Sequence, residues 1–148
     1  MKKFIAKLIV GDVVQKVFVD APFDRVVDSL TEAVKKHDFG IQAVHDLKET
    51  YLKKKLLLDP NFEYKIVQIC NAPKSYKALQ DMSFDMGVMM PKSIIVAQEN
   101  GKTSMRFMKM KPWLVSLMFP ELDVAPLSRH IAKIMNEIVE ETIAGVQE

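Results

Sequence analysis

The feature that most constrains the fold is a hairpin signal in the second half of the chain. Asn100-Gly101 is the residue pair preferred in type I′ turns, and it lies between two apolar segments within residues 92–110. A two-residue turn of this kind joins neighbouring antiparallel strands. Glu99 and Lys102 are then expected to face each other beside the turn as a favourable pair. The hairpin therefore predicts a sheet that is at least partly antiparallel.

Three other segments have the apolar periodicity or the end signals of helices. The stripe between Pro22 and Gly40 is acidic near its start and basic near its end, and Gly40 is expected to end this helix as its C′ residue. Pro73 suits the first turn of a shorter helix over residues 73–81. A broad apolar stripe over residues 127–146 predicts a final helix of about 20 residues.

Strands are predicted around Val17, over residues 41–47 and over residues 63–70, and the last is expected to be buried on both faces. Residues 48–62 are ambiguous between helical turns and a loop, and residues 82–91 are expected to form a loop or partial turn. This order favours an α+β fold. We expect a two-layer sandwich: a mainly antiparallel sheet, helices packed on one face, and a long C-terminal helix.

Composition narrows the class of protein. No internal repeat or linker is evident, so residues 1–148 are treated as one domain, with residues 1–12 as an N-terminal arm rather than a secretion signal. A net charge of +2 is too balanced to indicate a nucleic-acid-binding protein. The single cysteine cannot form an internal disulfide, which permits a reducing compartment, and we expect a cytoplasmic location.

Cys70 has two interpretations. It ends an apolar strand just before the helix that starts near Pro73, where exposed backbone N–H groups could activate the thiol. Free cysteine is also a compact apolar residue that commonly fills buried space. A metal site would need partners from elsewhere in the fold, and His45 is the other candidate ligand.

Methionine is frequent, with ten residues in the chain, and eight of them lie between Met82 and Met118. Thioethers bind copper(I) or an axial haem position, but they also fill irregular cores and adaptable binding surfaces. The apolar segment 112–120 contains the only tryptophan, Trp113. It is expected to be core or a subunit interface, with contact to a membrane surface as the other interpretation.

The segments "YKIVQICNAPKSYKAL" and "GVMMPKSIIVAQENGKTSMRFM" resemble the bacterial and archaeal domain-of-unknown-function family three hundred and two (DUF302). That family shows a tyrosine-led strand ending in Cys-Asn-Pro, and a Leu-Pro-Cys before a strand-turn-strand. Here the first motif is one residue longer, because Ala72 lies between Asn71 and Pro73. Lys92 replaces the cysteine of the second motif, so the resemblance implies that any paired-thiol role is lost. It also implies a compact, commonly dimeric α/β fold and no assigned activity.

No catalytic motif is present: the chain lacks a glycine-rich phosphate loop, G-x-S-x-G and H-E-x-x-H. We therefore expect a non-enzymatic homodimeric domain that binds a small apolar ligand or a protein partner through its Met-rich apolar region. The alternative is a redox, haem or soft-metal protein that uses Cys70. The candidate ligand-binding residues are Cys70, Asn71, Met86, Met89, Met90 and Trp113.

Overall fold

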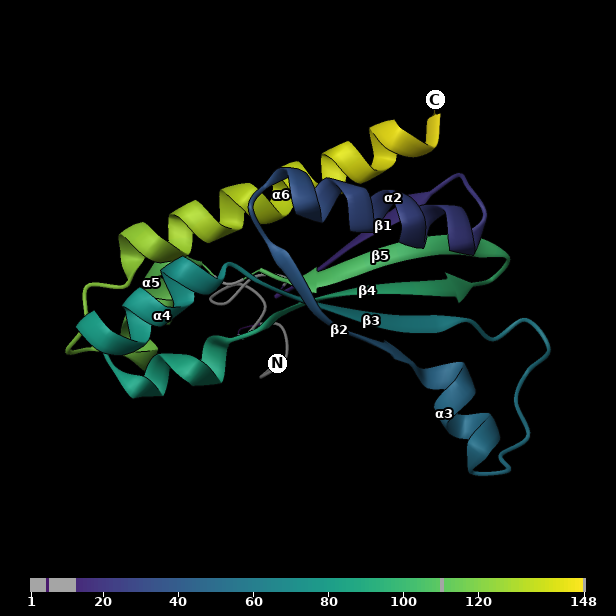
Figure 1. The fold of residues 1–148 in the computed structure, drawn as a ribbon, viewed down its shortest axis with the longest axis horizontal. Coiled ribbons are helices and arrows are strands. Elements are labelled where there is room, and N and C mark those ends of the chain that lie inside the picture. The colour runs from purple at the N-terminus through teal and green to yellow at the C-terminus, as the bar shows by residue number, and fades with distance from the viewer. Residues whose placement is uncertain (1–4, 6–12, 110, 148) are drawn as a thin grey trace.

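The computed structural model describes residue 5, residues 13–109 and residues 111–147, so the arm expected at residues 1–12 lies almost wholly outside the described residues. Figure 1 shows the arrangement of the elements. In chain order they are β1 (Val14–Val19), α2 (Phe23–Lys36), β2 (Gly40–Asp46), α3 (Leu47–Lys53), β3 (Tyr64–Cys70), α4 (Ala72–Asp81), the 3-10 helix η1 (Phe84–Met89), β4 (Lys92–Glu99), β5 (Lys102–Met108), α5 (Pro112–Met118) and α6 (Ala125–Gln147).

The five strands form one sheet in the order β1-β5-β4-β3-β2, and every neighbouring pair is antiparallel. The hairpin prediction is confirmed. Asn100 and Gly101 both have positive φ values, 52° and 74°, as a type I′ turn requires. The predicted α+β class, with an antiparallel sheet and a long C-terminal helix, is therefore what the chain forms.

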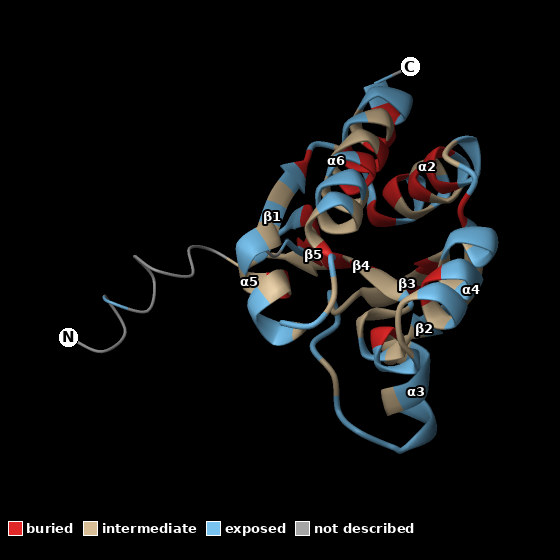
Figure 2. Ribbon diagram, turned by 90° about the vertical axis from the view of Figure 1, so that its left-hand side faces the viewer, coloured by how far each residue is buried: buried red, intermediate tan, exposed pale blue. Residues whose placement is uncertain are grey.

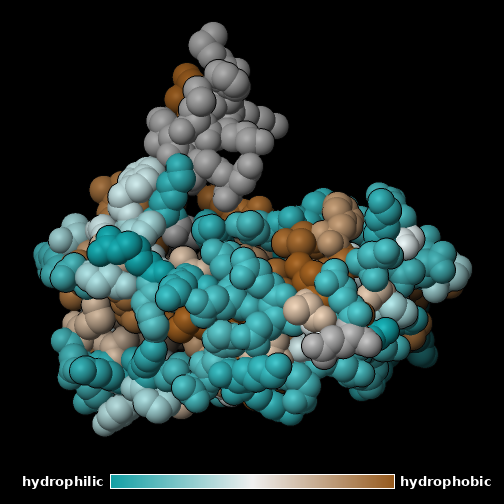
Figure 3. Space-filling model, turned by 90° about the horizontal axis from the view of Figure 1, so that it is seen from above, coloured by the Kyte–Doolittle hydropathy of each residue, from teal (hydrophilic) through white to brown (hydrophobic). Residues whose placement is uncertain are grey.

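Helices α2 and α6 cover one face of the sheet and also pack against each other. Figure 2 shows that their buried residues lie on their inner sides. Leu30 of α2 and Ile138 of α6 are fully buried, together with Ile94 and Met105 of the sheet. The outer surface of this helical layer is mainly hydrophilic (Figure 3). The main core therefore lies between the sheet and two amphipathic helices.

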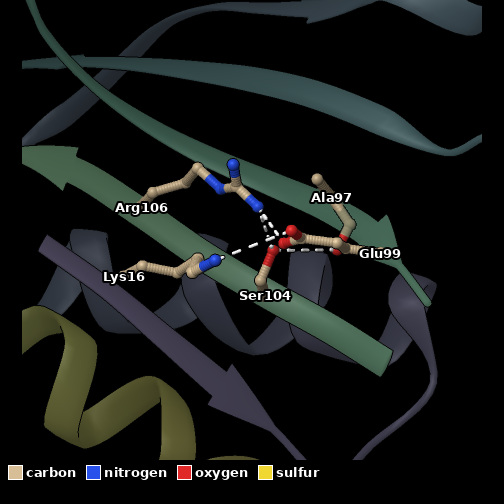
Figure 4. A network of polar contacts seen from close by, with 5 residues as sticks. All are labelled: Lys16, Ala97, Glu99, Ser104 and Arg106. Carbon is tan, nitrogen blue, oxygen red and sulfur yellow. Dashed lines mark hydrogen bonds and ion pairs between the residues drawn. The ribbon is translucent and has the colours of Figure 1, made fainter. Parts of the chain in front are cut away.

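The opposite face of the sheet carries a polar network centred on Glu99 (Figure 4). Its carboxylate accepts a hydrogen bond from Arg106 and lies 3.6 Å from Lys16 Nζ. Arg106 Nη2 also donates to Ser104 Oγ at 3.2 Å. Glu99 and Lys102 are indeed register partners, but the charge pair that we expected between them is not the one formed. Lys16 and Arg106 lie on the same face of the sheet as Glu99, and they form ion pairs with its carboxylate in place of Lys102.

Two expectations about local structure are wrong. The left-handed residue after α2 is Asp38, with φ of 60°, and Gly40 instead begins β2. A short aspartate tolerates this conformation, which lets Phe39 enter the core. Strand β3 is not buried on both faces, because only Val67 and Ile69, which face the helical layer, are buried.

Three short helices form in segments where the sequence pattern did not clearly predict a helix. Helix α3 occupies the start of the ambiguous segment and has no buried residue. Helices η1 and α5 lie near one end of the sheet. There Met86, Val115 and Val124 form a second, smaller apolar cluster with Leu79 and Leu127 packed against it. Within the described part of the chain, no helix is both long and apolar enough to cross a membrane.

Candidate ligand-binding cavity

A cavity of about 110 Å³ lies at the end of the sheet, where β3 passes into α4 and η1 leads into β4. Its lining side chains are mostly apolar. Helix α6 contributes five residues to the wall: Leu127, Ser128, Ile131, Ala132 and Met135. The cavity thus lies between the main core and the second apolar cluster, and both supply side chains to it.

The junction between β3 and α4 is held by local hydrogen bonds. The Asn71 side chain caps α4 by accepting a hydrogen bond from the Lys74 backbone N–H at 3.1 Å. The Cys70 thiol donates to Ser75 Oγ at 3.2 Å, and that hydroxyl donates to the Ala72 carbonyl at 3.0 Å. Cys70 is half-buried and lines the cavity, and this contact gives its thiol a hydrogen-bond partner.

Most residues that the sequence singled out are brought together here. Cys70, Asn71, Met86, Met89 and Met90 all line the cavity, although Met86 lies 16 residues after Cys70 in the chain. The Met-rich segment 82–91 was expected to form a loop or partial turn, and its residues 84–89 form the 3-10 helix η1. The short helix carries the methionines to the cavity wall.

Trp113 does not line this cavity. It lies on α5 with 45% of its surface exposed, whereas Val115 of the same helix is buried and does line the cavity. Successive residues of an α-helix are about 100° apart, so a residue two positions from Val115 is on nearly the opposite side. The structure therefore separates Trp113 from the other five candidates.

The structure does not bring His45 to Cys70. His45 pairs with Ile66 in the sheet, whereas Cys70 pairs with Gly40 at the other end of β2. At about 3.3 Å per strand residue, this separation is on the order of 16 Å. The His45 ring instead lies 3.0 Å from Gln68 Oε1. Among the described residues, no group of three or more His, Cys, Asp or Glu side chains could hold a metal ion.

Lys92 lines the cavity, although it was not among the candidate ligand-binding residues predicted from the sequence. It is the first residue of β4, on the same side of the strand as the buried Ile94 and Val96, and it lines the cavity. Burial lowers the pKa of the Lys92 ammonium below its ordinary value of 10.5, because desolvation disfavours the charged form. The alternation of β4 was the available signal, since position 92 shares the inward face with 94 and 96.

The fold and the cavity define a five-stranded antiparallel α+β domain with an apolar cavity at one end of its sheet. The family model described as "Domain of unknown function DUF302" matches residues 15–142, and the chain belongs to this family. The resemblance seen in the sequence is therefore confirmed.

Among solved structures, the chain is similar to that of an uncharacterized conserved DUF302 protein from Bacillus stearothermophilus. The two chains share 22% sequence identity with a TM-score of 0.74, over 88% of this chain and 98% of that one. This likeness shows a shared fold. No curated protein matches the chain.

Proposed function

We propose that this protein is a binding domain that holds a small, largely apolar molecule in the cavity between α4, η1, α6 and the sheet. The observation that carries this proposal is the cavity itself, about 110 Å³ of space with a mainly apolar wall. An engineered apolar cavity of about 150 Å³ binds benzene, so a ligand body of roughly five to seven non-hydrogen atoms has a suitable size.

The apolar wall favours an occupant, because apolar surface removed from water stabilises a complex by roughly 25 cal/mol per Å². Methionines 86, 89, 90, 108 and 135 line the space, and their flexible thioethers adapt to ligands of different shape.

Small aromatic molecules, with benzene as the first probe, test the proposal by ligand-observed NMR and thermal denaturation. The informative variant is Ala132→Leu, which extends a side chain from the α6 wall into the cavity. Ala144→Leu is the matched control, because Ala144 is an exposed residue of the same helix and does not line the cavity. We expect benzene to bind the wild type and the control, and not Ala132→Leu. Equal binding by all three would place the ligand elsewhere and contradict the proposal.

We also propose that the protein forms a homodimer through the end of the sheet near β1. Three exposed apolar residues support this surface: Val14 (61% exposed), Val88 (76%) and Met108 (56%). They line a second hollow of about 250 Å³. Within the described residues β1 pairs only with β5, so its outer edge offers unpaired backbone groups. Two copies of one edge strand can pair about a two-fold axis.

Light scattering at micromolar concentration tests the dimer. We expect a dimer for the wild type, a monomer for Val88→Asp, and a dimer for Val44→Asp. Val44 is the matched control because it is also an exposed apolar valine but lies on β2, the opposite edge of the sheet. A monomeric wild type would rule out this interface.

A further inference from the structure

The cavity has an unbalanced set of charges. Three lysines line it: Lys74 from α4, Lys92 from the start of β4, and Lys109 just after β5. Among residues 5, 13–109 and 111–147, no aspartate or glutamate contributes to the same wall. The chain as a whole is nearly neutral, with 21 basic and 19 acidic side chains, so this local excess is not a consequence of overall composition.

The three lysines also lack carboxylate partners among the residues that the structure describes. The lysines found there in ion pairs are 16, 35, 48, 53, 65 and 133, and none of these lines the cavity. Lys74 has the His130 ring as its side-chain neighbour. Of the twelve other lysines in the described part of the chain, six have a carboxylate partner, whereas none of the three at the cavity does.

Lys92 is the most consequential of the three. It begins a strand whose inward residues are buried, so its ammonium has lost much of its hydration without gaining an opposite charge. The cost of that desolvation falls when an anion enters the site, because a charge-assisted hydrogen bond replaces the lost water. The first turns of α4 and α6 also line the cavity, and helix N-termini add positive potential of the same sign.

We propose that the natural ligand is a small carboxylate with an apolar body, held with its carboxylate at Lys92 and its body against the methionines and the α6 wall. This inference rests on the proposed binding function and names the class of molecule bound. A free inorganic anion would leave the apolar wall uncovered, and a neutral hydrocarbon would leave Lys92 unpaired. An apolar carboxylate satisfies both parts of the cavity.

Benzoate and nitrobenzene form the appropriate pair of probes, because they have nearly the same shape and differ in charge. Binding of each is measured by NMR titration of the wild type. We expect benzoate to bind at least about tenfold more tightly than nitrobenzene, a difference equivalent to about 1.4 kcal/mol. Lys92→Met should remove this preference by weakening benzoate binding and should leave nitrobenzene binding within about twofold. The control Lys77→Met, an exposed lysine of α4 outside the cavity wall, should change neither.

The outcomes separate the two proposals. If nitrobenzene binds as tightly as benzoate in the wild type, the cavity binds small molecules without selecting carboxylates, and this inference fails while the binding function stands. If neither probe binds, the binding function fails as well. The wild-type comparison decides the matter even if Lys92→Met does not fold. Should benzoate keep its preference in a folded Lys92→Met variant, the anion site is not at Lys92 and the inference is overturned.

Discussion

The contact between α2 and α6 gives a prediction whose sign depends on one hydroxyl group. Gly145 of α6 faces Ser29 of α2, and a Cβ atom at position 145 would lie 2.4 Å from Ser29 Oγ. That hydroxyl donates to the Thr142 carbonyl at 2.8 Å. Gly145→Ala therefore forces the hydroxyl to leave its hydrogen bond or forces the helices apart. Either response weakens the packing of the helical layer.

The expected magnitude follows from two opposing terms. Alanine is more favourable than glycine inside a helix by about 1 kcal/mol. Loss of the hydrogen bond costs about 1 kcal/mol, and displacement of the helices adds to that cost. In the wild-type background, Gly145→Ala should be neutral to about 2 kcal/mol destabilising. In a Ser29→Ala background the nearest atom of residue 29 is its Cβ, which lies 3.7 Å from the new Cβ at position 145, an ordinary van der Waals contact. There the same change should stabilise the protein by about 1 kcal/mol.

Urea denaturation of the four proteins, followed by Trp113 fluorescence, measures the coupling between the two sites. We expect a coupling free energy of about 1 kcal/mol or more. Ala144→Gly is the control, because this exposed neighbouring position should report helix propensity alone and give the same cost in both backgrounds. Additive effects of Ser29→Ala and Gly145→Ala, within about 0.3–0.5 kcal/mol, would refute the reasoning.

Three further changes test the cavity and the core. Burial lowers the pKa of Lys92 from 10.5, so the unfolded chain binds this proton more readily than the folded protein does. The resulting penalty is full below the folded-state pKa and disappears above about 10.5. Lys92→Met should therefore be more stable than the wild type in urea at pH 7 and lose that advantage as the pH approaches 10.5; an equal difference throughout would contradict this. Asn71→Ala removes the cap of α4 and should cost about 1 kcal/mol by the same assay. Leu30→Ala removes a fully buried side chain and should cost about 2–5 kcal/mol; a cost below 1 kcal/mol would argue against the packing of α2 on the sheet.

Much of the fold could be predicted because its signals are local. The φ values needed at Asn100 and Gly101 are encoded in those two residues, and the periodicity of α6 is visible over its whole length. Helices η1 and α5 could not be predicted in the same way. They are six and seven residues long, too short for a clear period, and their buried residues Met86 and Val115 pack in a cluster assembled by the tertiary fold.

The part of the candidate site at the junction between β3 and α4 could be predicted from the sequence. Cys70 and Asn71 lie where the apolar pattern of the strand ends, and η1 follows α4 directly in the chain. The orientation of α5 was not available from the sequence, because a seven-residue helix with apolar residues on several sides does not indicate which side is buried. Trp113 was therefore grouped with residues from which the fold separates it.

Position 92, where the sequence departs from the Leu-Pro-Cys pattern of the resemblance, lines the cavity. Lys92 is the register partner of Ile69, the residue before Cys70, and both Lys92 and Cys70 line the same space. In this chain the position supplies a cation, and the remaining thiol is occupied by its hydrogen bond to Ser75. The scaffold fixes where the side chain at position 92 lies, and the side chain determines what can bind there. Under the proposed function, a cation at position 92 beside a hydrogen-bonded thiol favours anion binding over thiol chemistry, and Lys92 is the residue whose substitution tests the proposed ligand class.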